Sequence, residues 1–144
     1  MTYTLDGNQY SRQFVQTDAG RAKSLRVRQR NDCAVRALAI AAALEYDKAY
    51  NALARCGRRS GRGTSELILT DALSESGITY RRHTFPAIKG QRRINPVSFP
   101  VLKPQGRFMV RVAKHYYAYL DGVAYDEAPS NADRCIYSAI EVIL

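Results

Sequence analysis

A cysteine, a histidine and an aspartate occur in this sequence in settings that suit nucleophilic catalysis. Cys33 follows Asn31 and Asp32, which are both typical N-caps, so an apolar helix is predicted to begin at Cys33. The unpaired N–H groups and the positive dipole end of a helix stabilise a thiolate in its first turn and lower the pKa of the thiol. A nearby imidazole would complete the activation of this nucleophile.

Of the two histidines, His115 is the better candidate for the base. It opens a predicted strand at 115–120, and Asp121-Gly122 favours a tight type I′ turn into a second strand at 123–126. With a two-residue turn, His115 and Asp126 share one face of the hairpin, on a diagonal that their side chains can span. Asp126 is therefore expected to orient the imidazole as the third member of a triad.

Acyl transfer also needs hydrogen-bond donors for an oxyanion. The backbone N–H of Cys33 is one such donor, and a side-chain amide just upstream is the natural second. Gln29 is preferred to Asn31 in this role, because capping can occupy Asn31. Asn31 and Tyr117 are assigned to substrate binding.

The other thiols and the second histidine are expected to be structural. Cys56 and Cys135 are interpreted as inert, and His83, which follows two arginines, is expected to face solvent. There is no CxxC pair, so no structural zinc site is expected, and no other metal or cofactor is predicted.

The elements that must position these residues run from helices to strands along the chain. Helices are predicted at 33–44, 46–54 and 66–76, a loop at 86–104, and strands at 78–85, 107–113, 115–120, 123–126 and 135–144. Helices followed by an antiparallel sheet form an α+β fold. Residues 1–144 are expected to form one domain, in which 1–28 is a basic, loosely ordered lead-in with a short strand near 13–16.

Composition narrows the class of protein. The chain has 144 residues, of which 46% are hydrophobic and 24% are charged, as is typical of a globular domain. No apolar run approaches the ~20 residues that cross a membrane, and the N-terminus lacks the pattern of a signal peptide. The three cysteines are odd in number, which favours free thiols in a reducing compartment. A cytoplasmic protein without a membrane partner is expected.

The stretches RQRNDCAVRALAIAAAL and GRFMVRVAKHYYAYLDGVAYD resemble the papain-like cysteine peptidase superfamily, and more narrowly its small members in bacteriophages and bacteria. The resemblance implies a central helix and a small helical part packed on a C-terminal antiparallel sheet. It implies that Cys33 is the nucleophile, His115 the base, Asp126 the orienting residue and Gln29 the oxyanion donor. It also implies a protein or peptide substrate, cleaved in the host cytoplasm where the protein is encoded by a phage.

Two other functions remain open. The formal charge of +9 and the pI near 9.7 favour acidic substrates or partners, and a basic nucleic-acid-binding module with an incidental triad pattern is one alternative. The other is a non-catalytic phage protein that binds and inhibits a host protein.

Overall fold

A computed structural model describes residues 2–5, 8–11 and 13–144 of the chain. The described part is α+β, with a six-stranded sheet and four α-helices. The elements are, in chain order, β1 (Thr2–Leu5), β2 (Asn8–Ser11), β3 (Gln13–Gln16), the 3-10 helix η1 (Arg21–Lys23), α1 (Cys33–Ala41), α2 (Tyr46–Arg55), α3 (Glu66–Glu75), β4 (Thr79–Thr84), α4 (Phe99–Leu102), β5 (Arg107–Val112), β6 (His115–Leu120), β7 (Val123–Asp126) and β8 (Ser138–Ile143).

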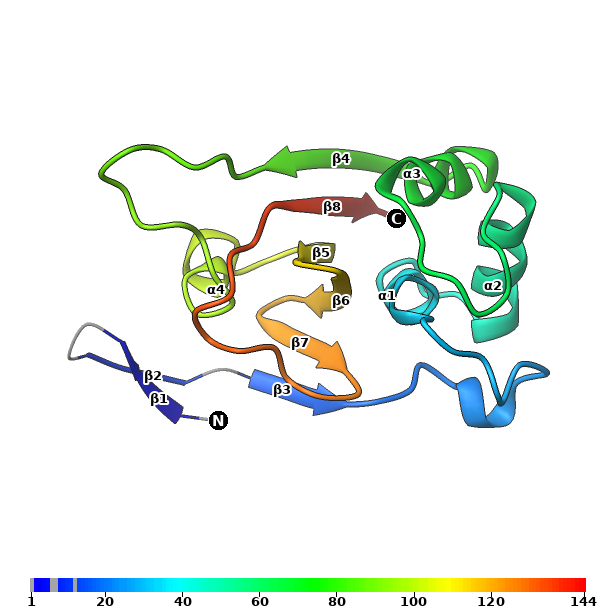
Figure 1. The fold of residues 1–144 in the computed structure, drawn as a ribbon, viewed down its shortest axis with the longest axis horizontal. Helices are drawn as coiled ribbons and strands as arrows, with labels where there is room; N and C mark the ends of the chain where they lie inside the picture. Colours follow the sequence, from blue (N-terminus) through cyan, green and yellow to red (C-terminus); the bar gives the residue numbers. More distant parts are fainter. Residues whose placement is uncertain (1, 6–7, 12) are drawn as a thin grey trace.

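The main sheet has the strand order β3-β7-β6-β5-β8-β4 (Figure 1). Every neighbouring pair is antiparallel except β3 and β7, which run parallel with Gln13 aligned to Val123. The strand predicted near 13–16 is confirmed, and the C-terminal strands β4–β8 pair antiparallel as predicted, but the sequence did not indicate that β3 joins their sheet as a parallel edge strand. This strand comes from the N-terminal segment and adds to the free edge of β7. β1 and β2 form a separate hairpin, and residues 1, 6–7 and 12 of the expected lead-in lie outside the described residues.

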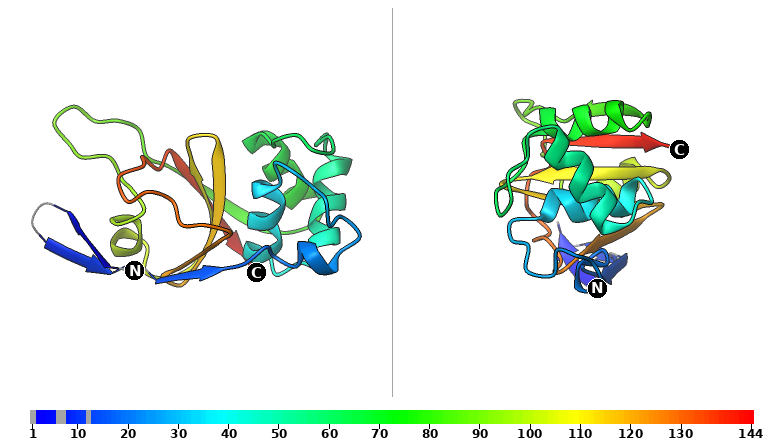
Figure 2. Two further views of the ribbon diagram at one scale, coloured as in Figure 1. Left: turned by 60° about the horizontal axis from the view of Figure 1, so that its bottom comes forward. Right: turned by 90° about the vertical axis from the view of Figure 1, so that its right-hand side faces the viewer.

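The sheet carries a hydrophobic core on each face. Helices α1–α3 cover one face, and α4 with its loops covers the other (Figures 1 and 2). Side chains alternate along β5, so Met109 packs toward the helices, whereas Phe108 and Val110 pack toward α4. The sheet is therefore buried on both faces, so a ligand can approach it only at the ends of its strands.

Helix α1 is buried almost all round, as its apolar sequence predicts, and it packs against β6 and α2. It begins at Cys33 as predicted but ends at Ala41, because Ala43 adopts a left-handed φ of 55° that no α-helix continues. The predicted starts of α2 and α3 are also confirmed, and the Ser65 hydroxyl caps α3 by accepting from the N–H of Ile68. None of the described helices is long and apolar enough to span a membrane.

The hairpin of β6 and β7 has the predicted two-residue turn. Asp121 and Gly122 both have positive φ, 45° and 91°, as a type I′ turn requires, and Leu120 pairs with Val123. This register brings the end of β7 beside the start of β6. The hairpin therefore places Asp126 close to His115.

Candidate active site

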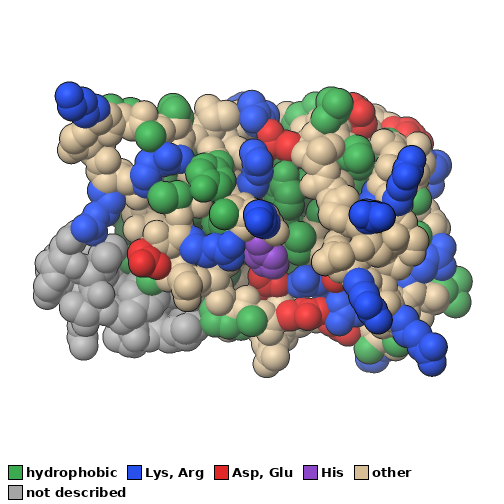
Figure 3. All heavy atoms as spheres, viewed as in Figure 1, with side chains coloured by type: hydrophobic (Ala, Val, Ile, Leu, Met, Phe, Trp, Pro, Cys, Tyr) green, Lys and Arg blue, Asp and Glu red, His purple; other side chains and the backbone are tan. Residues whose placement is uncertain are grey.

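Cys33 lies at the N-terminus of α1, where it lines an open hollow of about 520 Å³ together with His115. The thiol is half-buried, so a ligand in the hollow can reach it. Figure 3 shows one broad face of the molecule, on which a histidine side chain lies among Lys and Arg side chains, with acidic side chains just below it. The position of Cys33 thus combines a helix N-terminus with access from solvent.

The thiol of Cys33 and the imidazole of His115 lie next to each other across the gap between α1 and β6, close enough for each to shift the pKa of the other. Burial alone would raise the pKa of the Cys33 thiol. The interaction with His115, the backbone N–H of Tyr116 and the charge of Arg36 outweigh burial and leave this pKa lowered. The pKa of His115 is in turn raised to about 9. The lowered thiol pKa and the raised imidazole pKa together favour a thiolate beside a protonated imidazole.

Asp126 holds the other side of the imidazole. Its Oδ2 lies 2.5 Å from Nε2 of His115, so the ring nitrogen left to face the thiol is Nδ1. The bond to Asp126 is the main cause of the raised pKa of His115. The carboxylate is 5% exposed, and although burial would raise its pKa, the bond and charge of His115 leave that pKa lowered. The three residues predicted as a triad are thus brought together in the structure.

Arg36 connects the carboxylate of Asp126 to that of Asp32. Its Nη1 donates to Asp126 Oδ1 at 2.6 Å, and its Nε donates to Asp32 Oδ1 at 3.2 Å. Asp126 therefore binds His115 with one oxygen and Arg36 with the other, which fixes the plane of the carboxylate. Arg36 is 9% exposed, and a buried guanidinium needs such partners to offset its desolvation.

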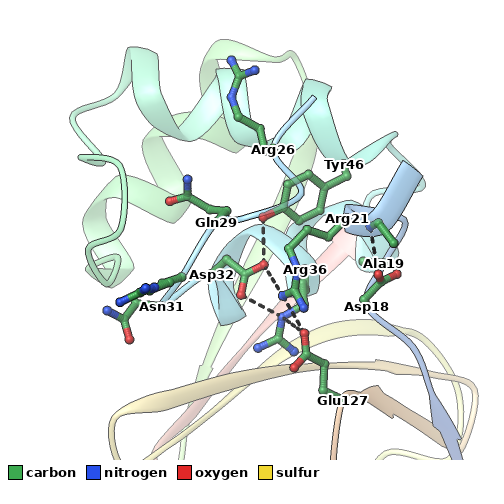
Figure 4. Close-up of polar contacts among 12 residues, drawn as sticks. Asp18, Ala19, Arg21, Arg26, Gln29, Asn31, Asp32, Arg36, Tyr46 and Glu127 are labelled. Atoms are coloured by element: carbon green, nitrogen blue, oxygen red, sulfur yellow. Dashed lines mark hydrogen bonds and ion pairs between the residues drawn. The ribbon is translucent and has the colours of Figure 1, made fainter. Parts of the chain in front are cut away.

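Asp32 occupies the N-cap position of α1, but its side chain caps no helical N–H. Its Oδ2 instead accepts from Arg21 Nη1 at 2.9 Å and from the Tyr46 hydroxyl at 2.8 Å (Figure 4). The same Arg21 nitrogen lies 2.6 Å from Glu127, which follows β7. Asp32 is therefore the N-cap residue, one of the two predicted for this position, but charged donors from other elements bind its carboxylate in place of a helical N–H.

Gln29 and Asn31 line the same hollow and hold the basic loop between α2 and α3. Gln29 Oε1 accepts from the N–H of Gly61 at 2.6 Å and from Arg58, and its Nε2 donates to Ser60 Oγ at 3.2 Å. Asn31 Nδ2 donates to the carbonyl of Gly61 at 2.8 Å. An amide nitrogen carries two hydrogens, so Gln29 keeps one N–H for the expected oxyanion role.

The structure corrects the assignment of Tyr117 to substrate binding. Tyr117 is 5% exposed and belongs to the core on the α4 side of the sheet, and it does not line the hollow at Cys33. Tyr117 lies on the same face of β6 as His115, because side chains two residues apart point the same way, but it is further along the strand and packs into this core. Only His115, at the start of the strand, reaches this hollow, and its neighbour Tyr116 lines a second hollow beside Cys33.

The remaining thiols and the second histidine lie elsewhere. The Cys56 thiol donates to Glu75 at 3.1 Å, which raises the pKa of Cys56, the opposite direction to that of Cys33. His83 was expected to face solvent, and this is wrong. Its Nε2 lies 2.9 Å from Glu141, and its ring packs against Phe108, because β4 aligns it with the interior of β8.

Sequence reasoning missed the charged network behind the triad. Arg36 is the only charge in α1, and it stands four residues after Asp32, which is the spacing of an ion pair on a helix. A lone charge in a buried helix needs a partner, so this signal was present in the sequence. The contacts of Arg21 with Asp32 and Glu127 have no local signal, since they join segments that only the fold brings together.

The arrangement can perform nucleophilic acyl transfer through a thiolate and an imidazolium. Among the described residues, no group of His, Cys, Asp and Glu is placed to hold a metal ion. No protein-family model, no curated protein and no solved structure matches this chain.

Proposed function

We propose that this protein is a papain-like cysteine hydrolase that cleaves a peptide or isopeptide bond through a thioester at Cys33. The observation that carries the proposal is the arrangement of the helix-terminal thiol beside His115, whose imidazole is in turn hydrogen-bonded to the buried carboxylate of Asp126. The order of a central helix followed by a sheet also fits this type of fold.

In the first half of the reaction, the thiolate of Cys33 attacks the carbonyl carbon and a C–S bond forms. The carbonyl oxygen becomes an oxyanion, which the backbone N–H of Cys33 and the free N–H of Gln29 stabilise. Nδ1 of His115 then gives its proton to the leaving amine as the C–N bond breaks. Asp126 stabilises the imidazolium until this transfer.

In the second half, water attacks the carbonyl carbon of the thioester while neutral His115 accepts its proton. The C–S bond breaks, a carboxylic acid leaves, and the thiolate–imidazolium pair is restored. An amine in place of water would give acyl transfer through the same steps.

A peptide library derived from a digested bacterial proteome tests the proposal. New peptide termini are expected after incubation with the wild-type protein at pH 7, and none above background after incubation with Cys33→Ser. Cys56→Ser is the matched control, since this thiol lies outside the site. Mass spectrometry of the peptides reads out the result. Equal cleavage by the wild type and Cys33→Ser would reject the proposal.

The net charge of +9 favours a second candidate, a nucleic-acid-binding module. Such a module would bind single-stranded oligonucleotides with a steep salt dependence that Cys33→Ser leaves unchanged. Absence of cleavage together with this behaviour would favour it over the hydrolase.

A further inference from the structure

Three hollows meet at the catalytic pair. The first is the hollow of about 520 Å³ at Cys33, and the second, of about 510 Å³, lies on the side of Glu66 and also reaches Cys33. The third, of about 450 Å³, extends from His115 past Asp126. Lys114 and His115 line all three, so the hollows form one continuous depression around the site.

The acidic side chains of this depression are each paired with an arginine. Asp32 and Asp126 are paired with Arg36, and Glu127 is paired with Arg21. Glu66, in the second hollow, is paired with Arg82 at 2.6 Å. These four carboxylates are paired with three arginines, so most of their charge is offset within the walls.

Four cations on the same walls are not neutralised. Within residues 13–144, none of them has a carboxylate within ion-pair distance. Arg30 lies in the first hollow, Arg111 in the second and Arg134 in the third. The fourth cation, Lys114, lines all three hollows. The depression is therefore positively charged on both sides of Cys33.

We propose that this depression selects peptide segments that carry acidic side chains on both sides of the bond that Cys33 attacks. Arg30 receives a carboxylate on one side of the bond and Arg111 on the other, and Lys114 lies between them. This inference rests on the proposed function, because it takes Cys33 as the point where the peptide crosses.

Discrete carboxylates fit this surface better than a continuous phosphate backbone. The cations share the walls with the paired carboxylates of Glu66 and Glu127, so they do not form the uninterrupted basic groove that tracks a phosphate backbone. An extended peptide advances ~3.3 Å per residue and can carry acidic side chains at some positions and neutral ones at others. Its carboxylates can therefore be spaced to meet separate cations on the walls. Complementary exposed charges of this kind contribute mainly to specificity and association rate.

Two peptides that differ only in charge test the inference. Fluorescein-labelled Glu-Glu-Gly-Gly-Glu-Glu and its all-Gln counterpart are titrated with the Cys33→Ala protein, and binding is followed by fluorescence anisotropy. The Glu peptide is expected to bind about tenfold tighter or more at low salt, with a smaller ratio at high salt. Lys114→Gln and Arg111→Gln should each reduce the ratio. Arg81→Gln, the matched control on β4, removes the same charge outside the three hollows and should leave the ratio unchanged.

Iodoacetamide labelling of wild-type Cys33 in the presence of each peptide locates the binding. Protection by the Glu peptide and not by the Gln peptide would support the inference. Equal binding of the two peptides would overturn it, even where Cys33 cleaves a neutral peptide. Stronger binding of a single-stranded oligonucleotide that displaces the Glu peptide would also overturn it, in favour of a nucleic-acid surface. A preference for the Glu peptide with an unreactive Cys33 would reject the hydrolase while supporting acidic-peptide recognition.

Discussion

Replacement of Arg36 by methionine is expected to lower the free energy of unfolding by about 3 kcal/mol or more, because it leaves buried carboxylates without their shared cation. Arg36 bridges Asp32 and Asp126, and it helps to keep the pKa of both carboxyl groups lowered in the folded state. A carboxyl group whose pKa is lowered in the folded state stabilises the fold at pH values above its ordinary pKa. This stabilisation is lost as the pH falls through the lowered pKa. The loss should therefore be larger at pH 7 than at pH 3, as urea denaturation at both pH values would show.

A matched control for this variant is Arg55→Met. Arg55 pairs with Glu75 at 2.9 Å on the exposed surface, so its replacement removes the same charge without a buried partner, and little change is expected. Arg36→Lys keeps the charge but cannot bridge two carboxylates, and an intermediate loss is expected. A wild-type unfolding midpoint for Arg36→Met at pH 7 would contradict the role given to this guanidinium.

Replacement of His115 by alanine is expected to reduce kcat/KM for a cleaved peptide by roughly 10²–10⁴-fold, the usual contribution of a general acid–base residue. The raised pKa of His115, about 9, means that the wild-type imidazole carries its proton at neutral pH. Hydrolysis should therefore decline as pH rises through about 9, where the leaving amine loses its proton donor. The profile of kcat/KM against pH for a peptide from the library measures both effects.

Asp126→Asn separates this account from a purely structural role of His115. The amide keeps the shape of the carboxylate but not its charge, so the pKa of His115 should move back toward its ordinary value. The alkaline limb of the hydrolysis profile should then shift to lower pH. An unshifted limb in Asp126→Asn, or wild-type turnover in His115→Ala, would count against the proposed triad.

Local patterns in the sequence were sufficient to predict the elements on which Cys33, His115 and Asp126 lie. Asp121-Gly122 fixed the turn, and with it the register that brings His115 to Asp126, because both central residues of a type I′ turn need positive φ. The start of α1 at Cys33 followed from the change from polar to apolar residues. These features depend on residues that are close together in the sequence, so they can be predicted from the sequence alone.

Long-range features of the site could not be predicted in the same way. The meeting of Cys33 with His115 depends on how α1 packs on β6, and no local pattern specifies that contact. Tyr117 was misassigned because alternation tells which residues share a face of a strand, but not how far a hollow at the strand end extends. The pairing of β3 with β7 was missed for a similar reason, since no local pattern specifies which sheet edge a short strand from a distant segment joins.

The alkylation rate of each cysteine against pH tests the central claim most directly. Iodoacetamide reacts with the thiolate, and peptide mass mapping reports the rates of Cys33 and Cys56 within one sample. The account predicts that Cys33 reacts rapidly below pH 7, that Cys56 reacts only at higher pH, and that His115→Ala moves the Cys33 profile to higher pH. A Cys33 that is protected, or that titrates near the ordinary thiol pKa of ~8.5 with no effect of His115→Ala, would contradict the thiolate–imidazolium pair.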